Sequence, residues 1–125
     1  MAYLDRFSHF YDKVITFART KYTYLFIYIF FSAGITLDHS NTNRLVLSRL
    51  SSNNQFEIEI WTTKNNGKTW TVEIVTKNSM NLNVRPIIPR FHNTMDEKLL
   101  ILWMSGQYQY WTNYSTSIKY KFVKQ

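Results

Sequence analysis

The side chains with the most chemical potential in this 125-residue chain are its basic and aromatic groups. Fifteen Lys and Arg outnumber eight Asp and Glu, which gives a formal net charge of +7. Nine Tyr, nine Phe and four Trp suit sugar binding, but also the cores of all-β proteins. A basic surface can meet an acidic polysaccharide, an anionic lipid or a nucleic acid. Because the cations are scattered and form no long run, we expect no nucleic-acid partner.

Several common kinds of catalytic site have no counterpart in the sequence. The absence of Cys excludes disulfides and cysteine-ligated metals, and three His without metal-ligand spacing indicate no metal site. We therefore expect no cofactor. The chain has neither a glycine-rich phosphate loop nor a nucleophile elbow. Glu57, Glu59 and Glu73 alternate along expected strands, which predicts a solvent-facing row and not a glycosidase carboxylate pair.

The elements that must position these side chains are organised around one predicted hairpin. Residues 56–61 and 70–75 alternate with period two, which predicts two half-buried strands. Between them, Gly67 can take the positive φ of a tight turn. Asn65 can bond backbone N–H groups within the turn, and Trp70 can fold over it and bury a large apolar face. These roles are structural.

The rest of the back part of the chain has the pattern of short strands separated by polar turns. Four further strands are expected, over residues 34–37, 45–49, 99–104 and 117–123. Two prolines in residues 84–90 exclude a central ladder position and predict an extended edge segment. Gly106 is expected to end the strand that begins at residue 99, before a polar-aromatic loop or hairpin. This spacing predicts an all-β sandwich, barrel or propeller.

The front of the chain has a different character. Apolar residues at steps of three and four over residues 2–19 predict an amphipathic helix. Residues 22–31 are almost unbroken apolar and aromatic, and three interpretations remain open. The run could be a buried strand or the core of a signal peptide. With the following residues included it could be a membrane anchor, so membrane contact through residues 22–37 is possible.

One stretch resembles a known sequence motif. The pattern Thr63-x-Asn65-x-Gly67-x-x-Trp70 resembles the Asp-box, Ser/Thr-x-Asp-x-Gly-x-x-Trp, with Asn65 where the motif prefers Asp. Other segments extend the likeness, namely Asp38-His-Ser-Asn41, Leu47-Ser-Arg49 and Asn83-Val-Arg-Pro86. Together they resemble the carboxy-terminal part of the bacterial neuraminidase repeat (BNR repeat) proteins. Those are secreted β-propellers that include sialidase-like proteins and some polysaccharide lyases acting on acidic glycans.

The resemblance covers residues 33–125 and leaves residues 1–32, the helix plus the apolar segment, unassigned. A propeller blade has four strands and about 40 to 50 residues, and a closed ring needs at least four blades. The matching region would supply about two blades. We therefore expect an all-β, incomplete β-propeller of about two blades, in effect a fragment. It would be preceded by the amphipathic helix and an apolar strand or span, and it would oligomerise if the propeller is to close.

The resemblance also implies candidate catalytic residues. Enzymes on this scaffold act on carboxylated sugars, so Arg49 and Arg85 are candidates for binding the carboxylate. In a lyase, an Arg would neutralise the uronate carboxylate, and His39 would polarise the substrate or act as an acid. The residues themselves also allow simpler roles. Arg49 could form a cross-strand ion pair, Arg85 could anchor a loop, and Asp38 with His39 could shape a turn.

These expectations describe a fragment of a secreted or cell-surface, carbohydrate-active protein that acts on or binds acidic glycans. The full-length relative would be a glycoside hydrolase or a polysaccharide lyase, and this chain alone is expected to be inactive. The alternative is a non-catalytic β-domain that binds a glycan or a protein through its aromatic, basic surface.

Overall fold

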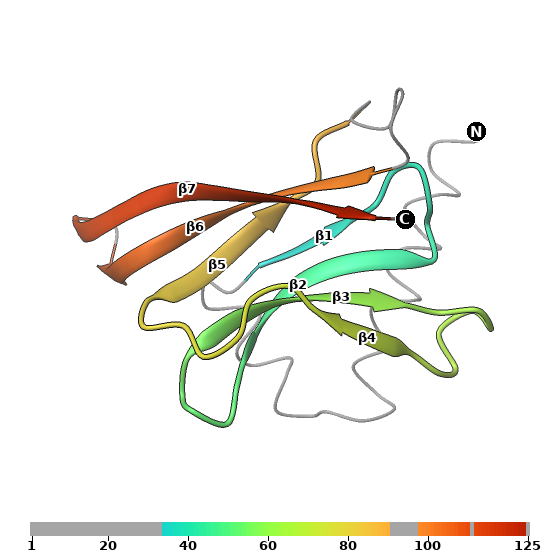
Figure 1. Cartoon of the computed structure of the whole chain (residues 1–125), viewed down its shortest axis with the longest axis horizontal. Coiled ribbons are helices and arrows are strands. Elements are labelled where there is room, and N and C mark those ends of the chain that lie inside the picture. The colour runs from blue at the N-terminus through green and yellow to red at the C-terminus, as the bar shows by residue number, and fades with distance from the viewer. Residues whose placement is uncertain (1–33, 91–97, 111, 125) are drawn as a thin grey trace.

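The computed structural model describes residues 34–90, 98–110 and 112–124, which form two antiparallel β-sheets and contain no helix (Figure 1). The all-β fold class expected from the sequence is therefore confirmed for these residues. The predicted helix over residues 2–19 and the apolar run over residues 22–31 lie outside the described part of the chain.

The first sheet is a four-stranded meander in chain order. Its strands are β1 (Ile35–Leu37), β2 (Arg44–Leu50), β3 (Phe56–Thr62) and β4 (Thr71–Ile74). Each strand pairs antiparallel with the next, and the register of β2 and β3 sets Val46 opposite Ile60. The predicted strands in this part of the chain are confirmed, because period-two alternation and turn residues are local signals that the tertiary structure did not override.

The second sheet has three strands in the order β5-β6-β7. They are β5 (Leu82–Ile87), β6 (Lys98–Tyr110) and β7 (Asn113–Lys124). The expectation that Gly106 ends the first of the two long strands is wrong, because β6 continues through it and pairs it with Thr116. At Gly106, with φ 148°, a Cβ would collide with the backbone carbonyl of Ser115. Glycine here lets β7 approach β6 closely.

Strand β5 is the edge strand that the two prolines predict. Its register against β6 shifts between Val84 and Ile87, so the ladder is interrupted where Pro86 has no N–H to donate. Within this bulge Arg85 has a positive φ of 54°, which is uncommon for a residue other than glycine.

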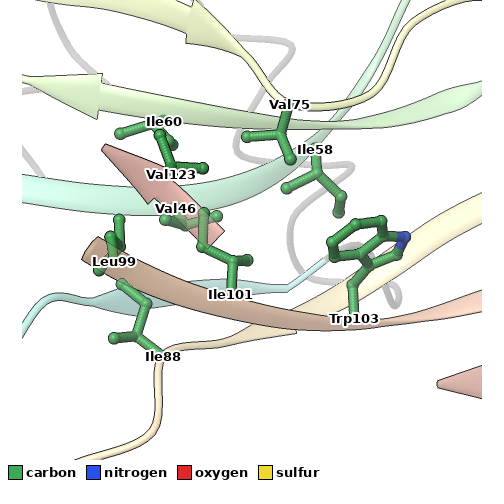
Figure 2. Close-up of a cluster of buried hydrophobic side chains, with 9 residues drawn as sticks. All are labelled: Val46, Ile58, Ile60, Val75, Ile88, Leu99, Ile101, Trp103 and Val123. Carbon is green, nitrogen blue, oxygen red and sulfur yellow. The ribbon is translucent and has the colours of Figure 1, made fainter. Parts of the chain in front are cut away.

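The two sheets pack face to face around a shared apolar core. Figure 2 shows Ile58 and Val75 on one side of the core and Ile101 and Trp103 on the other. The full cluster is Val46, Ile58, Ile60, Val75, Ile88, Leu99, Ile101, Trp103 and Val123. Alternation explains which residues enter it, because successive side chains of a strand point to opposite faces.

The opposite face of the first sheet carries a second apolar cluster. Leu45, Leu47 and Trp61 are buried there, with Ile35, Leu37 and Trp70 packed against them. Both faces of β2 are therefore apolar at their centres. This explains why Leu45-Val46-Leu47 is an unbroken apolar run and does not alternate.

A buried polar network links the two sheets beside the core. Glu57 accepts hydrogen bonds from Thr76 Oγ1 at 2.5 Å and from the backbone N and side-chain Oγ of Ser79 at 2.7 and 2.8 Å. The Nδ2 of Asn83 lies 3.3 Å from the same carboxylate, and its Oδ1 accepts from Trp103 Nε1 at 2.9 Å. The expected solvent-facing Glu row is therefore wrong for Glu57, which is buried, because Thr76 and Ser79 of the β4–β5 connection lie against it.

The core position Ile101 provides a test of this packing. Ile101 is fully buried, whereas Ile118 on the neighbouring strand is 65% exposed. We expect Ile101→Ala to lower the free energy of unfolding by about 2–5 kcal/mol. Ile118→Ala, the matched control, should change it by about 0.5 kcal/mol or less. Urea unfolding followed by Trp fluorescence measures both values, and similar losses in the two variants would contradict the observed arrangement of the sheets.

Candidate functional site

The hairpin between β3 and β4 has the internal bonding expected of an Asp-box. Thr63 is buried, and its Oγ1 accepts a hydrogen bond from the backbone N of Gly67 at 2.9 Å. Asn65 Oδ1 accepts from the backbone N of Thr69 at 2.8 Å, while Asn65 Nδ2 donates to Thr69 Oγ1 at 2.9 Å. Asn65 thus bonds the backbone as an Asp would, and its amide adds a donor.

Trp70 closes this hairpin. Its Nε1 donates to the carbonyl of Gly67 at 3.1 Å, and its ring packs against the apolar cluster around Leu45 and Trp61. Gly67, with φ 87°, occupies the left-handed position that the turn requires. The polar groups of Thr63, Asn65 and Trp70 are bonded within the turn. The motif therefore stabilises the sheet and offers no evident binding group.

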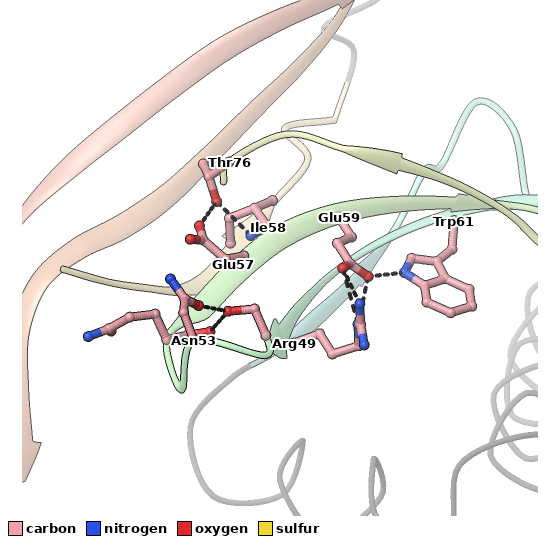
Figure 3. A network of polar contacts seen from close by, with 9 residues as sticks. Arg49, Asn53, Glu57, Ile58, Glu59, Trp61 and Thr76 are labelled. Carbon is pink, nitrogen blue, oxygen red and sulfur yellow. Dashed lines mark hydrogen bonds and ion pairs between the residues drawn. The ribbon is translucent and has the colours of Figure 1, made fainter. Parts of the chain in front are cut away.

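Arg49 is engaged in an ion pair within the first sheet. Its Nε lies 2.9 and 3.1 Å from the two carboxylate oxygens of Glu59, and its Nη2 lies 2.7 Å from Oε1 (Figure 3). Glu59 also accepts from Trp61 Nε1 at 2.9 Å. The Glu59 side chain is only 5% exposed, so the expected solvent-facing row is wrong here as well. Arg49 supplies the counter-charge that a buried carboxylate needs.

His39 is exposed in the turn that follows β1, and the contacts that hold this turn are made by Asp38. Asp38 is fully buried and accepts from the backbone N and Oγ of Ser40 at 2.9 and 2.6 Å. It also forms an ion pair with Arg44 at 3.5 Å. The described contacts of Asp38 thus shape the turn, which is the simpler of the two roles expected for Asp38 and His39.

Arg85 stands at the other end of β1, against Gly34. A Cβ added at Gly34 would lie 2.9 Å from the Cα of Arg85, so this close approach needs glycine. The carbonyl of Gly34 accepts from the backbone N of Ser48 at 3.1 Å, which fixes this point to the first sheet. Gly34 therefore brings the first sheet directly against the backbone of Arg85.

The Arg85 side chain is exposed and lies against an aromatic pair. Its Nη2 is 3.2 Å from the hydroxyl of Tyr108, and its guanidinium carbon is 5.0 Å from the centroid of the same ring. Tyr108 on β6 lies opposite Tyr114 on β7, with ring centroids 6.3 Å apart. Among the described residues the ion pairs are Arg44–Asp38 and Arg49–Glu59, so Arg85 has no carboxylate partner there.

The structure therefore does not bring the three predicted residues together. Arg49 lies on the outward face of the first sheet beside Glu59, His39 lies in a turn, and Arg85 lies on the second sheet. The sequence patterns did not point to Tyr108 and Tyr114, which lie in the predicted polar-aromatic loop or hairpin. Alternating Tyr residues across a tight turn were the available signal, since they predict one aromatic face of a hairpin.

Charge is segregated between the two sheets. The cations of the second sheet are Arg85, Lys98, Lys119, Lys121 and Lys124, and its described strands contain no Asp or Glu. The acidic residues of the described part of the chain, Asp38, Glu57, Glu59 and Glu73, all belong to the first sheet or its turns. Every charged residue on the described strands of the second sheet is thus basic, and a surface of this kind suits an anionic partner.

Comparisons of this chain with protein-family models, with curated proteins and with solved structures found no match. Within the described ranges, no group of three or more His, Asp or Glu is placed to hold a metal ion. The same ranges include no helix with the length and hydropathy needed to span a membrane.

The Thr63 hydroxyl offers a test of the hairpin. Thr63→Val keeps the shape of the side chain but leaves the buried N–H of Gly67 without its acceptor. We expect the free energy of unfolding to fall by about 1–3 kcal/mol. Thr62→Val, at the partly exposed neighbouring position, is the control and should cost about 0.5 kcal/mol or less. Equal denaturation midpoints for the two variants would show that the hydrogen bond from Gly67 to Thr63 does not stabilise the hairpin.

The ion pair of Arg49 offers a second test. Arg49→Ala leaves the buried carboxylate of Glu59 with the indole of Trp61, and we expect a loss of about 1.5–3 kcal/mol in unfolding free energy. Arg49→Met combined with Glu59→Gln removes both charges and should recover part of that loss. Chemical denaturation measures both variants. Unchanged stability of Arg49→Ala, together with loss of glycan binding, would instead assign Arg49 to a ligand site.

Proposed function

We propose that this chain is a non-catalytic β-domain that binds acidic glycans, with Arg85, Tyr108 and Tyr114 as the recognition site. The observation that carries the proposal is the exposed guanidinium of Arg85, which lies against the Tyr108 ring and has no carboxylate partner among the described residues. A guanidinium binds a sugar carboxylate through two parallel hydrogen bonds, and an exposed aromatic ring offers an apolar face to a sugar ring.

The backbone of Arg85 supports this assignment. A residue other than glycine held in the left-handed region costs about 1–3 kcal/mol, and such strain clusters at functional sites. The bulge between Val84 and Ile87 also changes the direction of the side chain between them. Because the second sheet lacks Asp and Glu, no carboxylate on its strands competes with the ligand for Arg85.

The sequence resemblance supports the choice of ligand. In this proposal the chain is a partial BNR-repeat, sialidase-like β-propeller, with the Asp-box-closed first sheet as one blade and the second sheet as an incomplete neighbour. A four-stranded antiparallel meander is the unit that such blades share. The proposal extends to a secreted or cell-surface location, where acidic glycans occur, and to oligomerisation if the propeller is to close.

We propose a binding domain and not an enzyme because the predicted catalytic residues lie apart from one another. Arg49 neutralises Glu59 within the first sheet, and His39 lies in a turn at the far end of β1 from Arg85. A lyase or hydrolase needs a carboxylate-binding Arg and an acid or base within hydrogen-bonding reach of one sugar. The described residues around Arg85 offer two Tyr hydroxyls but no His or carboxylate.

Glycan binding can be measured with a sialylated oligosaccharide and a uronate polysaccharide as probes and neutral dextran as the control ligand. We expect Arg85→Met to weaken binding of the acidic probes by about tenfold or more, because each charge-assisted bond contributes about 1.5–3 kcal/mol. Arg90→Met removes the same charge from another exposed position and should change affinity by about twofold or less. Tyr108→Phe keeps the ring and should have a smaller effect than Arg85→Met.

Three outcomes would contradict the proposal. The unchanged protein could fail to retain either acidic probe, or it could bind neutral dextran equally well. Arg85→Met and Arg90→Met could also weaken binding to the same extent, which would indicate attraction by net charge alone. Release of product from either probe would reinstate the enzymatic alternative.

A further inference from the structure

The outward face of the first sheet is buried, although the described part of the chain places no second layer over it. Leu45, Leu47 and Trp61 lie on the face opposite to the second sheet, and they are only 2%, 0% and 5% exposed. The partly buried residues that pack against them are Ile35, Leu37 and Trp70. We call these six residues the outward cluster. Neighbours within a sheet shield the flanks of a side chain, whereas burial of a whole face needs another element above it.

The second sheet shows how an apolar outward face looks in this molecule when nothing covers it. Leu102 of β6 has a paired residue on each side, as Leu47 of β2 does. Leu102 is nevertheless partly exposed, and its neighbours Ile87 and Tyr120 are 58% and 67% exposed. Lateral neighbours alone therefore do not explain why Leu47 is fully buried.

The element that covers the outward cluster has to meet two requirements. It belongs to the same chain, because the exposures of Leu45 and Leu47 are those of a single copy. As an outer layer it also needs an apolar face toward the sheet and a polar face toward water. Residues 2–19 have this pattern, since Phe10 and Val14 lie on one predicted helical face and Asp12 lies off it.

The other long stretches outside the described ranges fit these requirements less well. Residues 22–31 are almost unbroken apolar and aromatic, so as an outer layer they would expose apolar groups to water. Residues 91–97 are mostly polar and belong to the connection between β5 and β6 of the other sheet. Only residues 2–19 combine an apolar stripe with a polar remainder.

We propose that residues 2–19 form an amphipathic helix that packs on the outward cluster of the first sheet. A helix over this range is about 27 Å long, and β2 (Arg44–Leu50) spans about 23 Å. Residues 20–33 reach up to about 46 Å when extended, which is enough to place the helix over the centre of the sheet. The inference does not depend on the proposed glycan site, which lies on the second sheet.

Single cysteines test this inference in the full chain, which contains no Cys of its own. Leu47→Cys places a thiol in the outward cluster, Ile101→Cys places one between the sheets, and Leu102→Cys places one on the outward face of the second sheet. Reaction with dithionitrobenzoate measures how accessible each thiol is. We expect the thiol at position 102 to react at least about tenfold faster than those at positions 47 and 101, because a buried group reacts only after local opening.

Phe10→Ser, combined with each cysteine, then weakens the apolar face of the predicted helix. We expect it to raise the reaction rate at position 47 by about tenfold or more and the rate at position 101 by about twofold or less. The matched control is Ile15→Ser, because Ile15 lies about 140° around the predicted helix from Phe10. It should change the rate at position 47 by about twofold or less. Urea unfolding confirms that the variants are folded, and Phe10→Ala replaces Phe10→Ser if that variant is not.

Four outcomes would overturn the inference. In the chain with Phe10 intact, the thiol at position 47 could react as fast as the one at position 102. Phe10→Ser could leave the rate at position 47 unchanged, it could raise the rates at positions 47 and 101 equally, or Ile15→Ser could have the same effect. None of these outcomes bears on the glycan site. Acidic-glycan binding should stay within about twofold in Phe10→Ser, because Arg85 and Tyr108 are unchanged.

Discussion

The chain of hydrogen bonds from Glu57 through Asn83 to Trp103 is the constraint on which the two sheets depend. A buried carboxylate must be satisfied, and Glu57 obtains its donors from Thr76, Ser79 and Asn83, which lie in the connection to β5 and in β5 itself. The side-chain oxygen of Asn83 in turn accepts a hydrogen bond from the indole N–H of Trp103, whose ring extends into the core. The network therefore sets where the second sheet begins relative to the first, and the apolar core follows that placement.

The two sheets that this network joins have opposite electrostatic characters. The first buries Asp38, Glu57 and Glu59, with Glu59 neutralised by Arg49 and Asp38 holding a turn, and exposes only Glu73. The second has only cations on its strands and carries aromatic and aliphatic side chains outward. The charged groups of the first sheet are thus used mainly within the fold, and the second sheet is where we propose that a ligand binds. The proposed glycan site is located on the second sheet for this reason.

Arg49 and Arg85 show how neighbours decide the role of a side chain. Both were equal candidates as carboxylate-binding groups, and both lie on or beside strands. Arg49 lies diagonally across the ladder from a buried Glu59, so its charge is used within the sheet. Arg85 lies in a bulge on an edge strand, where the nearest described partner is a tyrosine and not an acid. In the proposed site, its guanidinium therefore has donors to offer to a ligand.

Local patterns in the sequence were sufficient to predict the all-β class, most of the strands and the hairpin closed by Trp70. Period-two alternation, turn residues and the Thr63–Trp70 spacing act over a few residues, so the chain carries that information directly. The tertiary structure alone decided that Glu57 and Glu59 are buried, that β6 passes through Gly106, and that Tyr108 meets Arg85. Each of those outcomes depends on which strands come together and in which register, and contacts between residues ten or more positions apart leave no periodic signal in the sequence.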